Sequence, residues 1–128
     1  MFWRKALKYW RSTLVACSIL YACLLREPSL QVPPIQHADK WIHLLAFGVL
    51  SLVVLLDSKS AAIKPWQGIL LAVLFPIVYG GAIEWLQEEF FYPRSGDWWD
   101  WLADSIGTGI AVSAWVVAHR WYDRRSIK

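Results

Sequence analysis

Charged and polar side chains that could do chemistry gather at three places in this chain, each next to an apolar stretch. At the first place, Asp39 lies four residues before His43 and Lys40 lies three residues before it, so a helix would put all three on neighbouring faces. Carboxylates, an ammonium and an imidazole in contact can bind a polar ligand, hold a cation or exchange protons. Their chemistry therefore depends on what the other two places contribute.

The other two places follow further along the chain. Glu84 and Gln87 are three residues apart near the end of an apolar stretch, and Arg94 lies in the connection that follows. A further series recurs at steps of three and four residues: Asp97, Asp100, Asp104 and Gly107. On a helix this series forms one stripe with stacked carboxylates.

Such groups are costly beside hydrocarbon, since a charge at the centre of a membrane span is unfavourable by roughly 2.5 to 3.5 kcal/mol. We therefore expect them to turn inward, with Lys40 and Arg94 neutralising part of the carboxylate charge. The candidate polar pocket consists of Asp39, Lys40, His43, Glu84, Gln87, Arg94, Asp97, Asp100 and Asp104. The alternative is that the acids only cap helices and tie loops, which is the interpretation we favour for Glu88 and Glu89.

The sequence predicts no cofactor and no metal, and it assigns no catalytic residue. No ligand spacing such as H-E-x-x-H is present, although His43 with the nearby carboxylates leaves a metal site open as an alternative. Cys17 and Cys23 are six residues apart in an apolar run and fit neither a zinc pattern nor a redox C-x-x-C motif.

The elements that must position these residues are membrane helices. Hydrophobic residues make up 57% of the 128 residues and the mean hydropathy is +0.35, more apolar surface than a soluble domain of this size could bury. Four apolar stretches each approach the roughly 20 residues that cross a bilayer. They cover residues 10–26, 41–56, 66–87 and 102–119. We predict a single all-α domain over residues 1–128, a bundle of four transmembrane helices.

The distribution of positive charge predicts the orientation. Ten lysines and arginines fall in the two terminal segments and the middle connection: Arg4, Lys5, Lys8, Arg11, Lys59, Lys64, Arg120, Arg124, Arg125 and Lys128. The remaining three are Arg26, Lys40 and Arg94. Because cytoplasmic loops carry the excess of lysine and arginine, both termini should be cytoplasmic and the polar pocket should face outward. The excess of basic over acidic residues then reflects anchoring at the cytoplasmic membrane surface and predicts no nucleic-acid partner.

The N-terminus also permits a second interpretation. A basic segment followed by an apolar run is the pattern of a signal peptide, and Leu20-Tyr21-Ala22-Cys23 loosely resembles a lipobox. Tyr21 is bulky for that pattern and apolar residues continue past Cys23, so we favour a retained span.

Several ordered motifs together resemble the VanZ-like family. They are Asp39-Lys40-x-x-His43-x-x-Ala46-Phe47, then Tyr79 and Ile83-Glu84-x-x-Gln87, then Arg94-x-x-Asp97-x-x-Asp100-x-x-x-Asp104-x-x-Gly107. The chain departs from the family pattern at Asp104, where Asn is usual, and at Ala111, near which a glycine is expected. The resemblance implies a small membrane protein of the bacterial cell envelope, with one relative associated with resistance to the glycopeptide teicoplanin.

These observations lead to one expectation and two alternatives. We expect a protein of the bacterial cytoplasmic (inner) membrane whose outward-facing pocket binds the polar headgroup of a lipid or of a cell-wall intermediate, with Arg94 and Lys40 as anion contacts. The first alternative is a membrane-embedded enzyme using acid/base or metal-assisted chemistry. The second is a small transporter. The oligomeric state is left open.

Overall fold

The computed structural model describes residues 1–25, 37–92 and 95–127, and within these ranges the regular elements are all helical. The N-terminal part consists of short pieces that follow one another: α1 (Phe2–Ala6), η1 (Leu7–Tyr9), α2 (Trp10–Leu20) and η2 (Tyr21–Leu25), the last a π-helical turn. Three long helices follow: α3 (Ala38–Ser60), α4 (Pro65–Phe90) and α5 (Trp98–Ser126). The all-α fold class predicted from the sequence is thus confirmed for these residues.

Three of the four predicted spans coincide with helices that are long and apolar enough to cross a membrane, namely α3, α4 and α5. These helices have 23, 26 and 29 residues and extend beyond the predicted spans at both ends. They do so because charged residues at a span's end can lie in the headgroup region without breaking the helix. Together they indicate a membrane protein. The first predicted span corresponds to α2 and η2, and α2 alone, at 11 residues, is shorter than a bilayer crossing.

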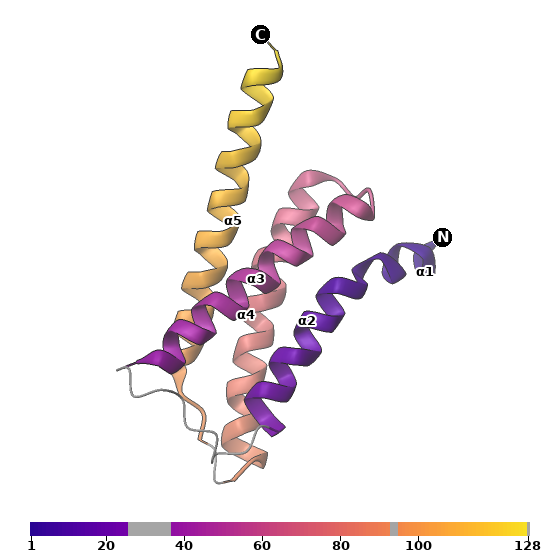
Figure 1. Ribbon diagram of the computed structural model, residues 1–128. Coiled ribbons are helices and arrows are strands. Elements are labelled where there is room, and N and C mark those ends of the chain that lie inside the picture. Colours follow the sequence, from indigo (N-terminus) through magenta and orange to yellow (C-terminus); the bar gives the residue numbers. More distant parts are fainter. Residues whose placement is uncertain (26–36, 93–94, 128) are drawn as a thin grey trace.

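The helices give the bundle two distinct ends (Figure 1). At one end, which we call the polar end, the first turns of α3 and α5 meet the last turns of α4, because Lys40 contacts Asp97 and Asp100 while Glu84 contacts Asp97. At the opposite end, the N-terminal segment meets the end of α3, where Lys8 donates to the carbonyl of Ser60. The last turns of α5 extend past the other helices at this end (Figure 1).

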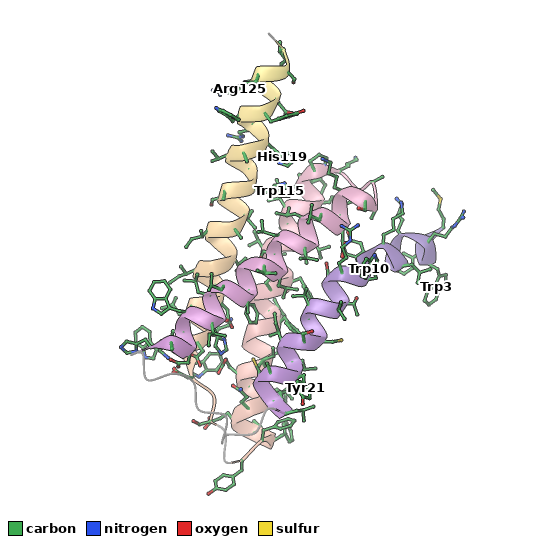
Figure 2. The ribbon with its side chains drawn as sticks, viewed as in Figure 1. Trp3, Trp10, Tyr21, Trp115, His119 and Arg125 are labelled. Carbon is green, nitrogen blue, oxygen red and sulfur yellow. The ribbon has the colours of Figure 1, made fainter. Side chains whose placement is uncertain are left out.

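Exposed tryptophans lie near both ends. Trp41, Trp85, Trp98 and Trp99 are at the polar end and more than half exposed. Trp3, Trp10, Trp66 and Trp121 belong to the opposite half and are equally exposed, and Figure 2 shows Trp3 and Trp10 on the N-terminal segment. Along α4, Trp66 and Trp85 are separated by about 28 Å at 1.5 Å per residue. Indole rings favour the two membrane interfaces. The separation of these two groups of exposed tryptophans is therefore close to the thickness of the hydrocarbon core of a bilayer, about 30 Å.

The apolar core lies between α3 and its neighbours. Phe47, Leu50 and Val54 of α3 are almost fully buried and pack with Ile83 of α4 and Val112 of α5. Helices α3 and α5 approach each other closely at Gly107, because a β-carbon added there would overlap the carbonyl of Leu44. The axes of α3 and α5 can come this close only where a residue has no side chain.

Side chains of α4 hold the N-terminal segment against the bundle. The Tyr79 hydroxyl donates to the carbonyl of Ala16 at 2.6 Å, and Gln87 Nε2 donates to the carbonyl of Cys23 at 2.8 Å. The first acceptor lies in α2 and the second in η2. The short N-terminal helices are therefore fixed to α4 at two separate turns.

Candidate functional site

Lys40 is the centre of an ion-pair network at the polar end. Its Nζ donates to Asp97 Oδ2 and to Asp100 Oδ1, both at 2.8 Å, and to Asp39 Oδ2 at 3.2 Å. An ammonium has three protons, so three carboxylates satisfy it completely. Lys40 therefore acts as an internal counterion that ties the start of α3 to the start of α5.

Asp97 connects all three long helices. It is the N-cap of α5, where its Oδ1 accepts from the backbone N–H of Trp99 at 2.9 Å. Its own backbone N–H donates to Glu84 Oε2 of α4 at 2.7 Å, and its Oδ2 binds Lys40 of α3. The hydrogen bond from Lys40 is the main reason why the pKa of the Asp97 carboxyl lies below its ordinary value.

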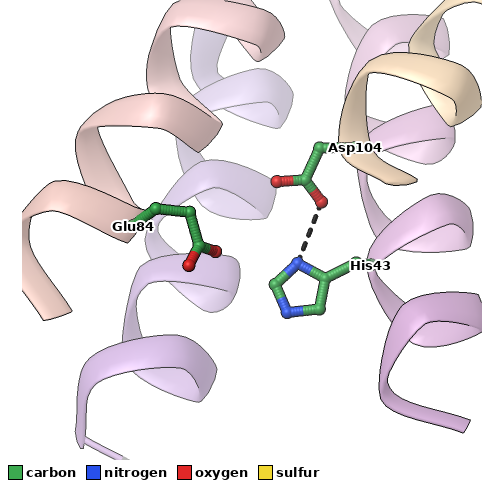
Figure 3. Close-up of side chains that lie close together, drawn as sticks. All are labelled: His43, Glu84 and Asp104. Atoms are coloured by element: carbon green, nitrogen blue, oxygen red, sulfur yellow. Dashed lines mark hydrogen bonds and ion pairs between the residues drawn. The ribbon is translucent and has the colours of Figure 1, made fainter. Parts of the chain in front are cut away.

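A second group lies deeper in the bundle and consists of His43, Glu84 and Asp104, which we call the His43 triad (Figure 3). His43 Nδ1 and Asp104 Oδ1 are 2.9 Å apart, and His43 Nε2 lies 3.7 Å from Asp100 Oδ2. Glu84 and Asp104 are each only 1% exposed. Among the described residues, Glu84 Oε1 and Asp104 Oδ2 have no hydrogen-bond partner. Two buried carboxylate oxygens are thus available to a ligand.

Helical spacing and a glycine explain how these side chains converge. Lys40 and His43 of α3 are three residues apart and face Asp100 and Asp104 of α5, which are four apart, so two rungs of a ladder join the helices. The predicted stripe of α5 therefore lies against α3. Gly80 of α4 makes room for Asp104, because a β-carbon there would lie 2.7 Å from Asp104 Oδ2.

The cluster contains more carboxyl groups than cationic side chains. Its carboxylates belong to Asp39, Glu84, Asp97, Asp100 and Asp104. Lys40 is the only lysine or arginine that forms an ion pair with any of them in the described parts of the chain. Excess negative charge in a partly buried site favours a cation or several hydrogen-bond donors as its ligand.

One of the nine predicted pocket residues stands apart from this cluster, and another lies outside the part of the chain that the structure describes. Gln87 is buried but turns its amide to the carbonyl of Cys23, so it holds the N-terminal segment. Arg94, expected as an anion contact, lies outside the described residues. The expected second anion contact, Lys40, is already bound by three carboxylates. The other seven predicted residues come together at the polar end.

An apolar groove begins at the same place. It lies between the N-terminal segment and α3, has a volume of about 580 Å³, and is lined by residues such as Val15 and Ile19 on one side and Ala46 and Val49 on the other. His43 belongs to its wall as well as to the triad. Ligand pockets in proteins typically have volumes of about 300 to 1,000 Å³. We call it the α2–α3 groove.

A polar contact at the opposite end did not emerge from the sequence. Asp57 is fully buried, and its Oδ2 accepts from the backbone N–H of Ser12 at 2.8 Å and from the Ser12 hydroxyl at 2.7 Å. The Arg11 guanidinium lies 3.6 Å from its other oxygen. The sequence held a signal for this, because Asp57 follows Val54 by three residues and Leu50 by seven, on the face that turns out to be buried.

The motif residues noted in the sequence thus lie mainly at one end of the bundle, at the contacts among α3, α4 and α5. Tyr79 and Gln87 differ, since their side chains bind the N-terminal segment. Comparison of the chain with protein-family models, with curated proteins and with solved structures finds no match.

Proposed function

We propose that this chain is a four-span protein of the bacterial cytoplasmic membrane that binds the polar headgroup of a lipid, or of a lipid-linked cell-wall intermediate, at its outward-facing polar end. The likeness of its motifs to the VanZ-like family supports a cell-envelope role, including an effect on glycopeptide sensitivity. The excess of lysine and arginine at the opposite end supports cytoplasmic termini.

The observation that carries the proposal is the position of His43. Its ring lies in the polar cluster and also forms part of the wall of the α2–α3 groove. A single amphiphile could therefore place its headgroup among the polar side chains and its hydrocarbon chain along Val15, Ile19 and Val49. The headgroup would then lie toward the membrane surface and the tail toward the hydrocarbon core, as in the bilayer itself.

A lipid-binding measurement tests this function. The purified chain in detergent is titrated with undecaprenyl phosphate and with phosphatidylglycerol, and thermal unfolding is followed by tryptophan fluorescence. Val49→Trp fills the groove without touching the polar cluster. Val117→Trp is the matched control, because Val117 is 66% exposed and lies on α5.

We expect at least one of the two lipids to raise the unfolding temperature of the wild type and of Val117→Trp by several degrees, and Val49→Trp to lose most of this shift. In cells, the wild type should alter teicoplanin sensitivity and Val49→Trp should not. If neither lipid stabilises the wild type, or if both tryptophan variants respond like the wild type, the proposed function is wrong.

One observation favours a second candidate, acid/base catalysis on a lipid-linked substrate. Asp104 orients the His43 ring through Nδ1, which leaves Nε2 facing the site near Asp100. A carboxylate that fixes one imidazole nitrogen while the other stays accessible is a common arrangement for a general base. Turnover of a lipid-linked pyrophosphate that disappears in His43→Gln would support this candidate over simple binding.

A further inference from the structure

The His43 triad differs from the outer part of the cluster in how its charge is balanced. Asp39, Asp97 and Asp100 share the ammonium of Lys40. Glu84 and Asp104 have no lysine or arginine partner among the described residues, and both are 1% exposed. Two carboxylates held out of water without a full counter-charge need a cation or protons to be stable.

The donor atoms of the triad are arranged for a metal ion. His43, Glu84 and Asp104 each offer one ligand atom, and these atoms lie within 4.8 Å of one another. Bonds of about 2.0 to 2.2 Å to zinc place neighbouring ligands roughly 3.4 Å apart, so shifts of about 1 Å or less would bring the set together. Figure 3 shows the Glu84 carboxylate facing the imidazole and the Asp104 carboxylate from the other side of the site.

A second observation points to a ligand at this position. Glu84 Oε1 and Asp104 Oδ2 are buried and have no hydrogen-bond partner in the described parts of the chain. The other oxygen of each is used by the protein, because Glu84 Oε2 accepts from Asp97 N–H and Asp104 Oδ1 contacts His43. In each carboxylate, one oxygen is thus held by the protein and the other is left for a ligand.

We propose that the His43 triad binds one divalent transition-metal ion, Mn²⁺ or Zn²⁺. Two carboxylates and a neutral imidazole with a divalent ion form a group of zero net charge, which suits a site inside a helix bundle. One nitrogen and two oxygen ligands match the preferences of these ions, and three protein ligands leave coordination positions open. In the headgroup-binding function proposed above, on which this role rests, those positions would take phosphate oxygens and let a negatively charged site accept an anionic lipid.

The test uses the full chain, purified with a tag that contains no histidine, stripped with a chelator and equilibrated with Mn²⁺ or Zn²⁺ alone. Bound metal is measured by elemental mass spectrometry and affinity by calorimetry. Glu84→Gln and Asp104→Asn remove one ligand charge each. Glu89→Gln is the matched control on an exposed position of the same helix, and Asp39→Asn removes a carboxylate that binds Lys40 instead.

We expect about one ion per chain in the wild type, in Glu89→Gln and in Asp39→Asn, and at least a tenfold loss of affinity in Glu84→Gln and Asp104→Asn. The unfolding temperature should rise with metal in the first three proteins only. Absence of saturable binding to the wild type, or equal binding to all five proteins, would overturn the proposal. If the two ligand variants fold poorly, His43→Gln supplies the same comparison.

Lipid titrations with and without chelator separate this proposal from the headgroup function. Binding of undecaprenyl phosphate that survives complete removal of metal would overturn the role of the metal in headgroup binding and leave the proposed function standing. Stoichiometric metal binding with no response to either lipid would leave the metal site standing and overturn the proposed function.

Discussion

At the scale of single residues, the cluster depends on Lys40. Its ammonium balances Asp97 and Asp100, whose carboxylates are 40% and 15% exposed. Lys40→Met removes the counter-charge while keeping the length of the side chain. We expect a loss of about 1 to 3 kcal/mol in the free energy of unfolding, because partly buried carboxylates lose their hydrogen bonds.

Chemical or thermal unfolding in detergent measures this effect. Lys59→Met is the control, since Lys59 is exposed on the same helix and has no ion pair among the described contacts. In Lys40→Met/Asp100→Asn the second change should cost less than it does alone, because the carboxylate that needed the lysine is gone. Equal stability of Lys40→Met and Lys59→Met would show that the network contributes nothing.

The sequence predicted which residues gather in this network, but it did not predict which group each side chain contacts. Helical spacing was sufficient to place Lys40 beside His43 and to stack Asp100 above Asp104. It could not show that Gln87 turns toward Cys23, because the direction of a side chain on a helix facing two neighbours depends on how those neighbours pack. Nor could it show that Lys40 would be fully used by carboxylates.

At the scale of helices, the contact between α3 and α5 relies on Gly107. Gly107→Ala would force the α5 backbone away from Leu44, and the ladder of Lys40–Asp100 and His43–Asp104 contacts would widen with it. We expect a loss of about 1 to 3 kcal/mol in the free energy of unfolding. Metal affinity should fall as well, although Gly107 is not one of the proposed metal-binding residues.

Gly109→Ala provides a matched control two residues away. A β-carbon at Gly109 meets no atom within 4 Å, so the change should be neutral or slightly stabilising, since alanine favours a helix. Thermal unfolding of the two variants in one detergent gives the comparison. Equal melting temperatures would contradict the close approach of α3 and α5.

The N-terminal segment depends on a cap supplied by another helix. Tyr9, the N-cap of α2, makes no side-chain cap bond, and Asp57 of α3 accepts from the Ser12 N–H instead. Asp57→Leu should cost about 2 kcal/mol or more, because it leaves that N–H unpaired and the Arg11 charge without its partner.

Trypsin cleavage after Arg11 reports on this contact. We expect faster cleavage in Asp57→Leu than in the wild type, and a smaller change in Ser12→Ala, which keeps the backbone bond. Unchanged cleavage in Asp57→Leu would show that the bonds between Asp57 and Ser12 do not hold the N-terminal segment in place.

Helix existence followed from the sequence, whereas helix ends did not. Apolar stretches of bilayer-crossing length predicted α3, α4 and α5, but each helix continues through polar residues at its ends, as α3 does through Asp57 to Ser60. Polarity marks where a helix leaves hydrocarbon rather than where its hydrogen bonding stops. The N-terminal segment is divided at Tyr9, whose hydroxyl is hydrogen-bonded to Ser58 of α3, and no local pattern in the sequence predicts this contact.

At the scale of the whole molecule, the two ends differ in charge. The polar end carries the acidic cluster, whereas the N-terminal segment and the last turns of α5 carry most lysines and arginines, including Arg125 (Figure 2). The Arg125 guanidinium lies 3.6 Å from the centre of the Trp121 ring. The headgroup and metal proposals both place the acidic cluster at the outer face. The orientation of the chain is therefore the claim on which the others depend.

Labelling of single cysteines tests that claim most directly. In a Cys17→Ala/Cys23→Ala background, Ser95→Cys reports on the polar end and Ser60→Cys on the α3–α4 turn, and both positions are exposed. We predict that a membrane-impermeant maleimide labels Ser95→Cys in intact spheroplasts, and labels Ser60→Cys only after the membrane is opened. Labelling of Ser60→Cys from outside, with Ser95→Cys protected, would contradict the account.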